Sequence, residues 1–227
     1  MSVGTRKRFQ LPEMEGRAAR WYARNRGSAS QMDLCRQDAA RLSAELDPAA
    51  AVLEVAPGPG YLAVEMARWG RLRVTGLDIS HTMVEIATEH ARKAGVRVEF
   101  LRGDVSALPF ATGSFDLVVC QAAFKNFKQP LEALNEIHRV LRAGGRAVVE
   151  DMNRDATNAD VAVEVRAMKL SPVSGFMTRL ILSTTLRRRA YSPARFQRLV
   201  AQSLFRTCRI ETRGIGLEVS LTKGQEA

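Results

Sequence analysis

Between residues 51 and 152, short apolar runs alternate with segments whose apolar residues recur every three or four positions. The runs predict buried strands, and the recurring positions predict amphipathic helices packed against them. Because strands and helices follow in turn, we expect right-handed βαβ crossovers and a parallel sheet. The predicted strands cover residues 52–55, 73–77, 99–102, 114–120 and 147–152, and the predicted helices cover 63–68, 80–94 and 130–143.

Capping residues mark two of these helices. Ser80 is expected as the N-cap of the helix over 80–94, and Gly95 is expected to end it. Pro130 suits a first helical turn. The helix that it opens is expected to bury Leu131, Leu134, Ile137 and Leu141 and to end at Gly144-Gly145.

The flanking regions depart from strict alternation. Helices are predicted over 16–22 and 28–46, before the first strand. A helical region over 158–187, with a break at 171–175, precedes a helix over 193–204 that Ser192-Pro193 caps. The last two strands, 207–212 and 217–221, are separated by Gly214-Ile215-Gly216, which predicts a hairpin.

The turn after the first predicted strand carries the most specific chemistry. Glu54 lies on that strand, and Gly58 and Gly60 form a loop without Cβ atoms that can lie against a ligand. Asp78 ends the next strand, where a carboxylate can accept hydrogen bonds from both hydroxyls of a ribose. These positions predict a bound nucleoside, although Gly58 to Ala63 also satisfies the dinucleotide pattern G-x-G-x-x-G/A.

Three features favour S-adenosylmethionine over a nicotinamide dinucleotide. The Glu54 carboxylate would repel a pyrophosphate but tolerates a sulfonium with an ammonium group. Asp104 follows the third strand, where it suits the exocyclic amine of adenine. The fourth strand ends at Cys120-Gln121-Ala122, which would face the same crevice.

These segments together resemble the class I S-adenosylmethionine-dependent methyltransferases, in particular the small-molecule branch with the ubiquinone/menaquinone-type enzymes. The resemblance is strong over about residues 50–152 and weak elsewhere. It implies a Rossmann-like, doubly wound, seven-stranded, mostly parallel sheet that ends in an antiparallel hairpin. Its motifs here are Glu54-Val55-Ala56-Pro57-Gly58-Pro59-Gly60, Leu77-Asp78-Ile79-Ser80, Gly103-Asp104-Val105, Ser114-Phe115-Asp116-Leu117-Val118-Val119 and Arg139-Val140-Leu141-Arg142-Ala143-Gly144-Gly145.

The resemblance also implies which residues bind the cofactor. Glu54 and the backbone of 56–60 would hold the methionine end, Asp78 the ribose, Asp104 with Val105 the adenine, and Gln121 the rim. The full predicted set is Glu54, Ala56, Pro57, Gly58, Gly60, Asp78, Ile79, Met83, Gly103, Asp104, Val105 and Gln121. The chain departs from the family at Ala56, usually glycine, and at Phe124-Lys125-Asn126-Phe127, where relatives often carry His and Trp.

Candidate catalytic residues are Lys125, Asn126 and Tyr22, because the first two follow the fourth strand and the third lies on a segment that could close over the crevice. Trp21 and Phe127 could line an aromatic acceptor site. The three histidines are disfavoured as bases, because histidine on a helix surface is the commoner outcome. A base-free enzyme that acts by proximity stays open.

Composition and charge bear on the expected partners, metal binding and location of the protein. Net charge is +10, yet no aromatic and basic interleaving supports a base-stacking surface. Nucleic acid is therefore a disfavoured partner that stays open, and Arg187-Arg188-Arg189 is interpreted as a solvated helix end rather than an anion clamp. The three cysteines lack metal-type spacing, so no metal site is predicted, and they are expected to be free thiols. No leader or membrane span is predicted, so we expect a cytoplasmic monomer or homodimer.

We expect residues 1–50 to form an N-terminal helical lid and 51–227 the methyltransferase domain, with 158–190 inserted as a helical cap. Deleting residues 1–26 is expected to impair acceptor binding more than cofactor binding. The leading function is methyl transfer to a small organic acceptor, on oxygen or nitrogen rather than carbon. The alternatives are an RNA or protein methyltransferase, a non-catalytic protein that binds the same cofactor, and, more distantly, a nicotinamide oxidoreductase.

Overall fold

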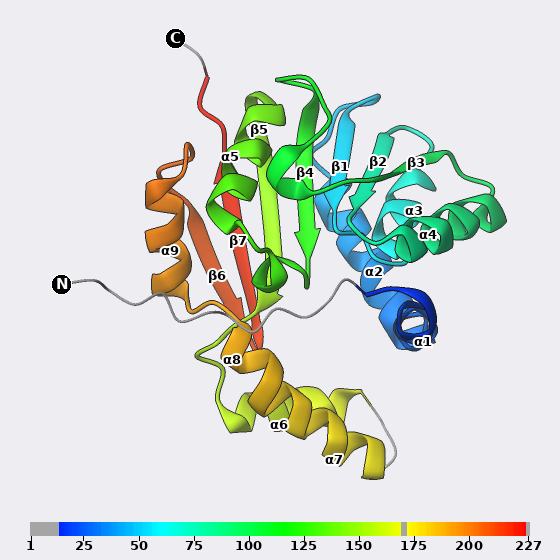
Figure 1. Ribbon diagram of the computed structural model, residues 1–227, viewed down its shortest axis with the longest axis vertical. Coiled ribbons are helices and arrows are strands. Elements are labelled where there is room, and N and C mark those ends of the chain that lie inside the picture. The colour runs from blue at the N-terminus through cyan, green and yellow to red at the C-terminus, as the bar shows by residue number, and fades with distance from the viewer. Residues whose placement is uncertain (1–13, 169–171, 226–227) are drawn as a thin grey trace.

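The computed structural model describes residues 14–168 and 172–225 and is built around one seven-stranded sheet (Figure 1). The strands follow one another across the sheet in the order β3-β2-β1-β4-β5-β7-β6. Their bounds are β1 Ala51–Val55, β2 Arg73–Asp78, β3 Val98–Arg102, β4 Phe115–Gln121, β5 Leu141–Met152, β6 Arg209–Arg213 and β7 Gly216–Thr222.

The pairing confirms the predicted fold. Strands β1 to β5 are parallel, and β7 pairs antiparallel with both β5 and β6. The chain therefore ends in the antiparallel hairpin expected from Gly214 to Gly216. The strand order reverses between β1 and β4, so the carboxyl ends of these two strands form the crevice at which open α/β sheets bind ligands.

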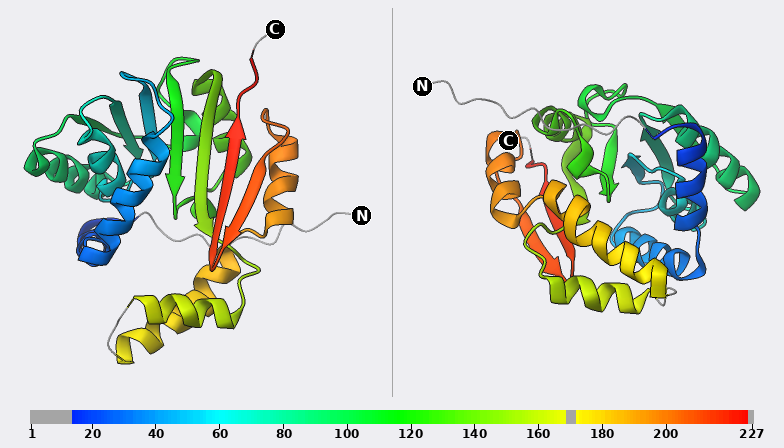
Figure 2. Two further views of the ribbon diagram at one scale, coloured as in Figure 1. Left: turned by 180° about the vertical axis from the view of Figure 1, so that it is seen from behind. Right: turned by 60° about the horizontal axis from the view of Figure 1, so that its bottom comes forward.

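Helices cover both faces of the sheet (Figure 2). Helices α2 and α3 pack on one face, where Leu42 and Met66 are fully buried against Val52 and Leu117. Helices α5 and α9 pack on the other, where Leu134 and Phe196 join a larger apolar cluster. The helices are α1 Gly16–Arg26, α2 Ala29–Ser43, α3 Tyr61–Ala67, α4 His81–Ala94, α5 Pro130–Val140, α6 Asn158–Ala167, α7 Pro172–Ile181, α8 Arg187–Arg189 and α9 Pro193–Gln202, with short turns η1 Val105–Ala107, η2 Phe124–Asn126 and a π-helical turn η3 Leu182–Leu186.

Two helical segments lie at the carboxyl edge of the sheet (Figures 1 and 2). One is α1, and the other is the helical cap, residues 158–190, which comprises α6, α7, η3 and α8 between β5 and α9. Both therefore lie at the end of the sheet where a ligand is expected to bind. Within the described residues, no helix is both long and apolar enough to cross a bilayer.

Local signals placed several helix ends correctly. Ser80 caps α4 by accepting a hydrogen bond from the Met83 amide, and Gly95 ends α4 at a φ of 67°. Ser192 caps α9 in the same way, through the Arg195 amide. Short polar N-caps and left-handed glycines carry their own mechanism, so these boundaries follow from a few adjacent residues.

Other boundaries were wrong. Helix α5 ends at Val140, Leu141 begins the long strand β5, and the glycine pair at 144–145 lies inside that strand at an irregularity in the β4–β5 register. The buried face of α5 is Ala133, Leu134, Ile137 and Val140, whereas Leu131 is only half-buried. Helix α1 extends to Arg26, and α2 ends at Ser43. Of the break predicted over 171–175, Ser171 lies outside the described residues, and α7 begins at Pro172 and continues through Gly175.

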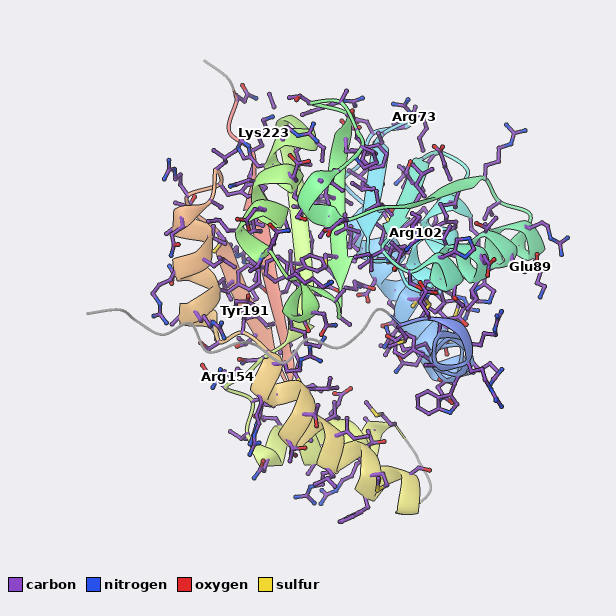
Figure 3. The ribbon with its side chains drawn as sticks, in the orientation of Figure 1. Arg73, Glu89, Arg102, Arg154, Tyr191 and Lys223 are labelled. Atoms are coloured by element: carbon purple, nitrogen blue, oxygen red, sulfur yellow. The ribbon has the colours of Figure 1, made fainter. Side chains whose placement is uncertain are left out.

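Exposed basic side chains are spread over the molecule. Arg73, Arg102 and Arg154 come from different parts of the chain and lie far apart in Figure 3, with Arg73 at the amino edge of the sheet, Arg102 at the end of β3 and Arg154 near the cap. Several other arginines are neutralised locally, as in the pairs of Arg92 with Glu89 and Arg139 with Glu136. The net charge of +10 is thus distributed over separate surfaces.

Candidate functional site

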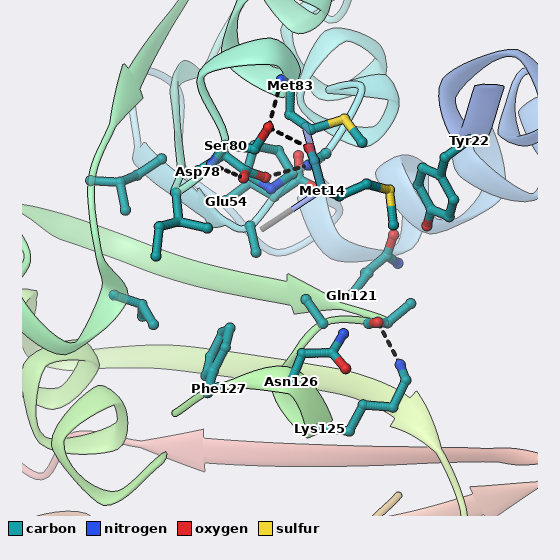
Figure 4. A pocket seen from close by; sticks show the side chains of 18 of the residues that line it. Met14, Tyr22, Glu54, Asp78, Ser80, Met83, Gln121, Lys125, Asn126 and Phe127 are labelled. Atoms are coloured by element: carbon teal, nitrogen blue, oxygen red, sulfur yellow. Dashed lines mark hydrogen bonds between the residues drawn. The ribbon is translucent and has the colours of Figure 1, made fainter. Parts of the chain in front are cut away.

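A cavity of about 740 Å³ opens at the carboxyl ends of β1, β2 and β4, between the sheet, α1 and the helical cap. Figure 4 shows Asp78, Ser80 and Met83 on one side of it and Lys125, Asn126 and Phe127 on the other. All of the predicted cofactor residues except Gly60 line this cavity: Glu54, Ala56, Pro57, Gly58, Asp78, Ile79, Met83, Gly103, Asp104, Val105 and Gln121. The predicted catalytic residues Tyr22, Lys125 and Asn126 line it as well.

Glu54 is buried at the end of β1 and is 4% exposed. Its carboxylate accepts a hydrogen bond of 2.9 Å from the Ala63 amide in the first turn of α3. Burial raises the pKa of Glu54 to about 8, although the bond from Ala63 opposes that rise. Without a cationic partner the side chain is therefore largely neutral at pH 7, and an approaching ammonium group would favour its ionised form.

Asp78 connects the glycine loop to the start of α4. One carboxylate oxygen accepts the Gly58 amide at 2.9 Å, and the other accepts the Ser80 amide at 2.9 Å. Burial raises the pKa of Asp78, while these two bonds act in the opposite direction. Each oxygen keeps a further lone pair for a ligand hydroxyl. The residue thus shapes the loop in addition to facing the cavity.

The turns that border the cavity hold strained backbone. Ala56 and Ala122 follow β1 and β4, the two strands at the switch point, and have φ values of 53° and 56°. Left-handed conformations at residues with a Cβ cost about 1–2 kcal/mol each and concentrate at functional sites. Ala56 is the position where the family usually has glycine, and the positive φ explains that preference.

The two loop glycines differ in role. Gly58 has a φ of 55°, and a Cβ there would lie 3.9 Å from the Tyr22 ring, so the loop passes close beneath α1. Gly60 does not line the cavity. A Cβ at Gly60 would lie 2.7 Å from the Phe100 ring and 2.8 Å from the Ala87 Cβ, so this position needs glycine for helix packing.

The predicted adenine side of the wall combines apolar side chains with one acid, Asp104. Ile79, Met83 and Val105 present apolar side chains to the cavity, and Gly103 leaves the wall open between them. Asp104 caps the turn η1 with one oxygen, which accepts both the amide and the hydroxyl of Ser106. Its other oxygen makes no hydrogen bond to any described residue, so it can accept one from a ligand amine.

Lys125 does not have the geometry of a base. Its ammonium lies 2.7 Å from an Asp151 carboxylate oxygen and also donates to the Ala122 carbonyl, and the side chain is buried. The second Asp151 oxygen accepts the Lys125 amide at 2.9 Å. This buried pair fixes the turn η2 and thereby positions Asn126 and Phe127 in the cavity wall.

Other predicted site residues fall in three groups. Gln121 lines the cavity, but its amide nitrogen donates to Asp38 and Glu150, so these two acidic residues fix the orientation of its side chain. Phe127 lines the cavity as predicted for an aromatic site, whereas Trp21 is 63% exposed and outside it. The histidines are elsewhere: His81 lies near Glu85, His90 stacks on Tyr61, and His138 packs on Phe205.

Sequence reasoning missed a set of cationic lining residues. Arg26 projects from α1, Lys128 follows η2, Arg188 and Arg189 come from α8, and Arg195 comes from α9. The run Arg187 to Arg189 was interpreted as a solvated helix end; Arg188 is exposed, as that interpretation expects, but Arg188 and Arg189 also line the cavity. Only the placement of α8 beside the sheet edge brings them to the cavity, and no adjacent residue indicates that placement.

The donor set fits S-adenosylmethionine better than a dinucleotide. A pyrophosphate binds to free amides at a helix N-terminus, but the Glu54 side chain already occupies the Ala63 amide of α3. A sulfonium nucleoside that also bears an ammonium group is instead attracted to two buried carboxylates, Glu54 and Asp78. The cavity thus places acidic side chains near the cationic end of the cofactor and apolar side chains near its adenine.

The comparisons with known proteins agree with this geometry. Residues 53–149 match the family described as a methyltransferase domain. A demethylmenaquinone methyltransferase from Thermus thermophilus is 41% identical over 99 residues, which are 43% of this chain and 45% of the relative. A ubiquinone/menaquinone biosynthesis C-methyltransferase from Geotalea uraniireducens is 35% identical over 102 residues, 43% of each chain. The chain thus aligns with less than half the length of these curated relatives.

Solved structures extend the likeness of fold beyond that core. A putative S-adenosyl-L-methionine-dependent methyltransferase from Methanococcus maripaludis has a TM-score of 0.71 at 20% identity and covers 100% of this chain and 99% of its own. The plantazolicin methyltransferase, solved in complex with a monoazolic desmethylPZN analogue and SAH, has a TM-score of 0.68 at 14% identity over 92% of this chain and 90% of its own. The predicted resemblance to class I methyltransferases is confirmed.

Proposed function

We propose that this chain, whose residues 53–149 belong to the methyltransferase-domain family, transfers the methyl group of S-adenosylmethionine to a small organic acceptor. One observation carries the proposal. Two buried carboxylates, Glu54 and Asp78, end adjacent strands on either side of a strained loop, and both face a cavity of about 740 Å³. That volume is within the range of small-molecule sites and accommodates two ligands of modest size.

When bound, S-adenosylmethionine supplies a methyl carbon already activated by its positive sulfur, so the protein does not have to create the electrophile. The chain has to orient the acceptor in line with that carbon and exclude water, which supplies several kcal/mol. Asn126 and Phe127 form the wall opposite the cofactor residues. Tyr22 from α1 and Thr185 from the cap extend the enclosure.

Among the described residues, the part of the wall that follows β4, where the acceptor would bind, holds no carboxylate, histidine, cysteine or tyrosine. The described lining residues after β4 are amides, apolar residues, a threonine, lysines and arginines, and Lys125 is already held by Asp151. The acceptor therefore has to bind with its nucleophilic group ionised, or lose its proton to water. This supports catalysis by positioning rather than by general-base assistance.

The names of the relatives bear on which atom of the acceptor receives the methyl group. The name of the Geotalea relative specifies C-methylation, which favours carbon over the oxygen or nitrogen expected from the sequence. The family match ends at residue 149, however, and Arg188, Arg189 and Arg195 lie beyond it. Carbon methylation is thus supported by the shared core, while the acceptor itself is selected by residues outside it.

Incubation with S-adenosylmethionine and cell extract, followed by mass spectrometry, tests the proposal. We expect S-adenosylhomocysteine to accumulate and one small molecule to gain the mass of a methyl group. Cofactor binding without product, against extract, RNA and protein fractions, would support the non-catalytic alternative. A methylated RNA or protein in place of a small molecule would support the second alternative, which the positive charge keeps open.

A further inference from the structure

With one exception among the described residues, charges of opposite sign occupy opposite halves of the cavity wall. The exception is Arg26 of α1, which lies on the side of Glu54 and partly opposes the rise that burial causes in the pKa of that residue. The three acids that line it, Glu54, Asp78 and Asp104, end or follow β1, β2 and β3 on one half of the sheet. Lys125 and Lys128 follow β4, and the arginines of the cap and of α9 follow β5. The strand order β3-β2-β1-β4-β5 therefore separates an acidic cofactor half from a cationic acceptor half.

Three cations of the acceptor half, Lys128, Arg188 and Arg189, have no counter-ion among the described residues, and two of them are adjacent in the cap. Within the described ranges, neither Arg188 nor Arg189 forms an ion pair or a hydrogen bond. Their neighbour Arg187 is outside the cavity wall, and its guanidinium donates to the Ala156 carbonyl and the Asn158 side chain at 3.0 Å each. The run of three arginines is thus divided between one structural residue and two residues with open donors at the cavity.

The cavity wall that contains Arg188 and Arg189 also provides a third cation, a polar group and an aromatic surface for a small ligand. The Arg195 guanidinium lies 4.7 Å from the centre of the buried Tyr191 ring, which holds a third cation in the wall. Asn126 adds an uncharged polar group, and Phe127 adds an aromatic surface. A guanidinium presents paired donors that match carboxylate and phosphate oxygens.

We propose that Arg188 and Arg189 form a subsite for an anionic group, carboxylate or phosphate, on an acceptor with an apolar or aromatic body. This inference rests on the proposed function, because it names the class of acceptor for the same cavity. It differs from what the quinone names of the relatives suggest, since the anion-binding residues lie outside the matched region. The same positive field would favour an ionised nucleophile, which fits a wall without a base.

Calorimetry on the protein saturated with S-adenosylhomocysteine tests the subsite. The probes are benzoate and phenyl phosphate, with benzamide as the neutral match for benzoate, all at one ionic strength. We expect at least one anion to bind at least tenfold more tightly than benzamide, and the stronger of the two identifies the preferred group. The double variant R188Q/R189Q is expected to lose at least tenfold in affinity for that anion while its affinity for S-adenosylhomocysteine changes less than twofold.

The variant R166Q/R179Q provides the matched control, because it removes the same charge from exposed positions of the cap that do not line the cavity. Equal binding of anions and benzamide, no binding of either anion, or equal losses in both double variants would overturn the subsite. Tighter binding of a short RNA than of either anion, lost in R188Q/R189Q, would also overturn it in favour of a nucleic-acid surface. Failure of S-adenosylhomocysteine to bind the wild-type protein would instead contradict the proposed function.

Discussion

At the scale of single residues, the acids of the site serve two purposes at once. Asp78 receives the Gly58 and Ser80 amides, and Glu54 receives the Ala63 amide. Each carboxylate therefore fixes the local backbone and also faces the cavity. A substitution at either position alters loop geometry together with ligand contacts, so a test needs a control acid that also holds backbone but lies away from the cavity.

Asp78→Asn is expected to weaken binding of S-adenosylhomocysteine by roughly 1.5–3 kcal/mol, about ten- to a hundredfold in the dissociation constant. The amide can accept only one of the two backbone bonds, and its NH₂ group would face the other donor. Calorimetry measures the change. Asp116→Asn is the control, because Asp116 accepts the Ala51 amide at 2.7 Å outside the cavity, and its loss is expected to leave the affinity unchanged. Equal affinities for wild-type protein and Asp78→Asn would contradict the assigned role.

The raised pKa of Glu54 makes the ligand-free protein sensitive to pH. The folded value is about 8 and the ordinary value is 4.5, so between these pH values the folded state retains a proton that the unfolded state has released. Its free energy of unfolding should therefore fall relative to that of Glu54→Gln as pH rises from about 4.5 to about 8, by up to about 1.4 kcal/mol per unit, and level off above 8. Urea unfolding of both proteins across this range measures the difference, and a constant difference would show that Glu54 titrates normally.

At the scale of elements, the start of α1 is joined to the start of α4. The Glu15 carboxylate accepts the His81 amide at 2.8 Å, the Thr82 amide at 3.0 Å and the Thr82 hydroxyl. The bonds from Thr82 lower the pKa of Glu15 to about 2, so the side chain is ionised over the physiological range. A negative charge at a helix N-terminus is favourable, and here it comes from a neighbouring segment. This contact places Met14 and Tyr22 in the cavity wall.

Glu15→Gln is expected to loosen α1 without unfolding the sheet. Tryptic cleavage between residues 16 and 26 should accelerate, because the amide carries no charge for the amides of α4. Glu85→Gln is the control, since Glu85 is an exposed acid on the same helix α4. Mass spectrometry of early fragments measures the rates, and equal rates in the two variants would exclude Glu15 as the anchor.

The structure changes the effect expected from deleting residues 1–26. Tyr22 lies above Gly58 in the glycine loop, and Tyr61 of α3 donates its hydroxyl to the Ala23 carbonyl at 2.9 Å. The described part of the N-terminal segment thus contacts the cofactor half, while the cap contacts the acceptor half. We now propose that removing α1 weakens cofactor binding, whereas acceptor selection belongs to the cap. Residues 1–13 of the predicted lid lie outside the described residues.

The elements that sequence reasoning placed well are those whose determinants are adjacent in the chain. Ser80 and Gly95 define α4 within their own turns, and Glu54 to Gly60 join a strand to a loop directly. The end of α5 was missed because apolar residues continue through Val140 into Leu141, and the strand that follows is fixed by remote contacts. Gly144 donates to the Lys223 carbonyl, and the Lys223 ammonium donates to the Leu141 carbonyl at 2.9 Å.

The distance between determinants along the chain also explains which site residues could be predicted from the sequence. Glu54 lies one residue before the end of β1, Asp78 ends β2 and Asp104 lies two residues beyond β3, so their approach to one another follows from a parallel sheet alone. The role of Arg188 and Arg189 depends on where a helical insertion packs, about forty residues beyond the last family motif. The exposed surface of α8 carries the same residue types that an ordinary solvated helix end carries, so only three-dimensional placement distinguishes the two.

At the scale of the whole molecule, the sheet with its flanking helices buries more apolar surface than the helical cap does. The sheet and its flanking helices enclose two large clusters, including Leu53, Ile137 and Val219. The buried members of the cluster between the cap and the sheet are Val161 and Ala190 of the cap and Met152 of β5, and Phe176 of α7 is 68% exposed. Local opening costs least where few apolar contacts are buried. The described part of the cap is therefore expected to open well before the sheet does.

Hydrogen exchange read by mass spectrometry is expected to show this difference. Amides of α6 to α8 should exchange well before those of β1, β4 and β5 in the ligand-free protein. S-adenosylhomocysteine alone should protect the glycine loop and α1, whereas an anionic probe added to that complex should protect α8, because the cofactor and acceptor halves are lined by different elements. The R188Q/R189Q variant should retain the first protection and lose the second. Protection of α8 by the cofactor alone, to the same extent as with the anion present, would mean that the cap closes on the cofactor and that the two halves of the cavity do not act separately.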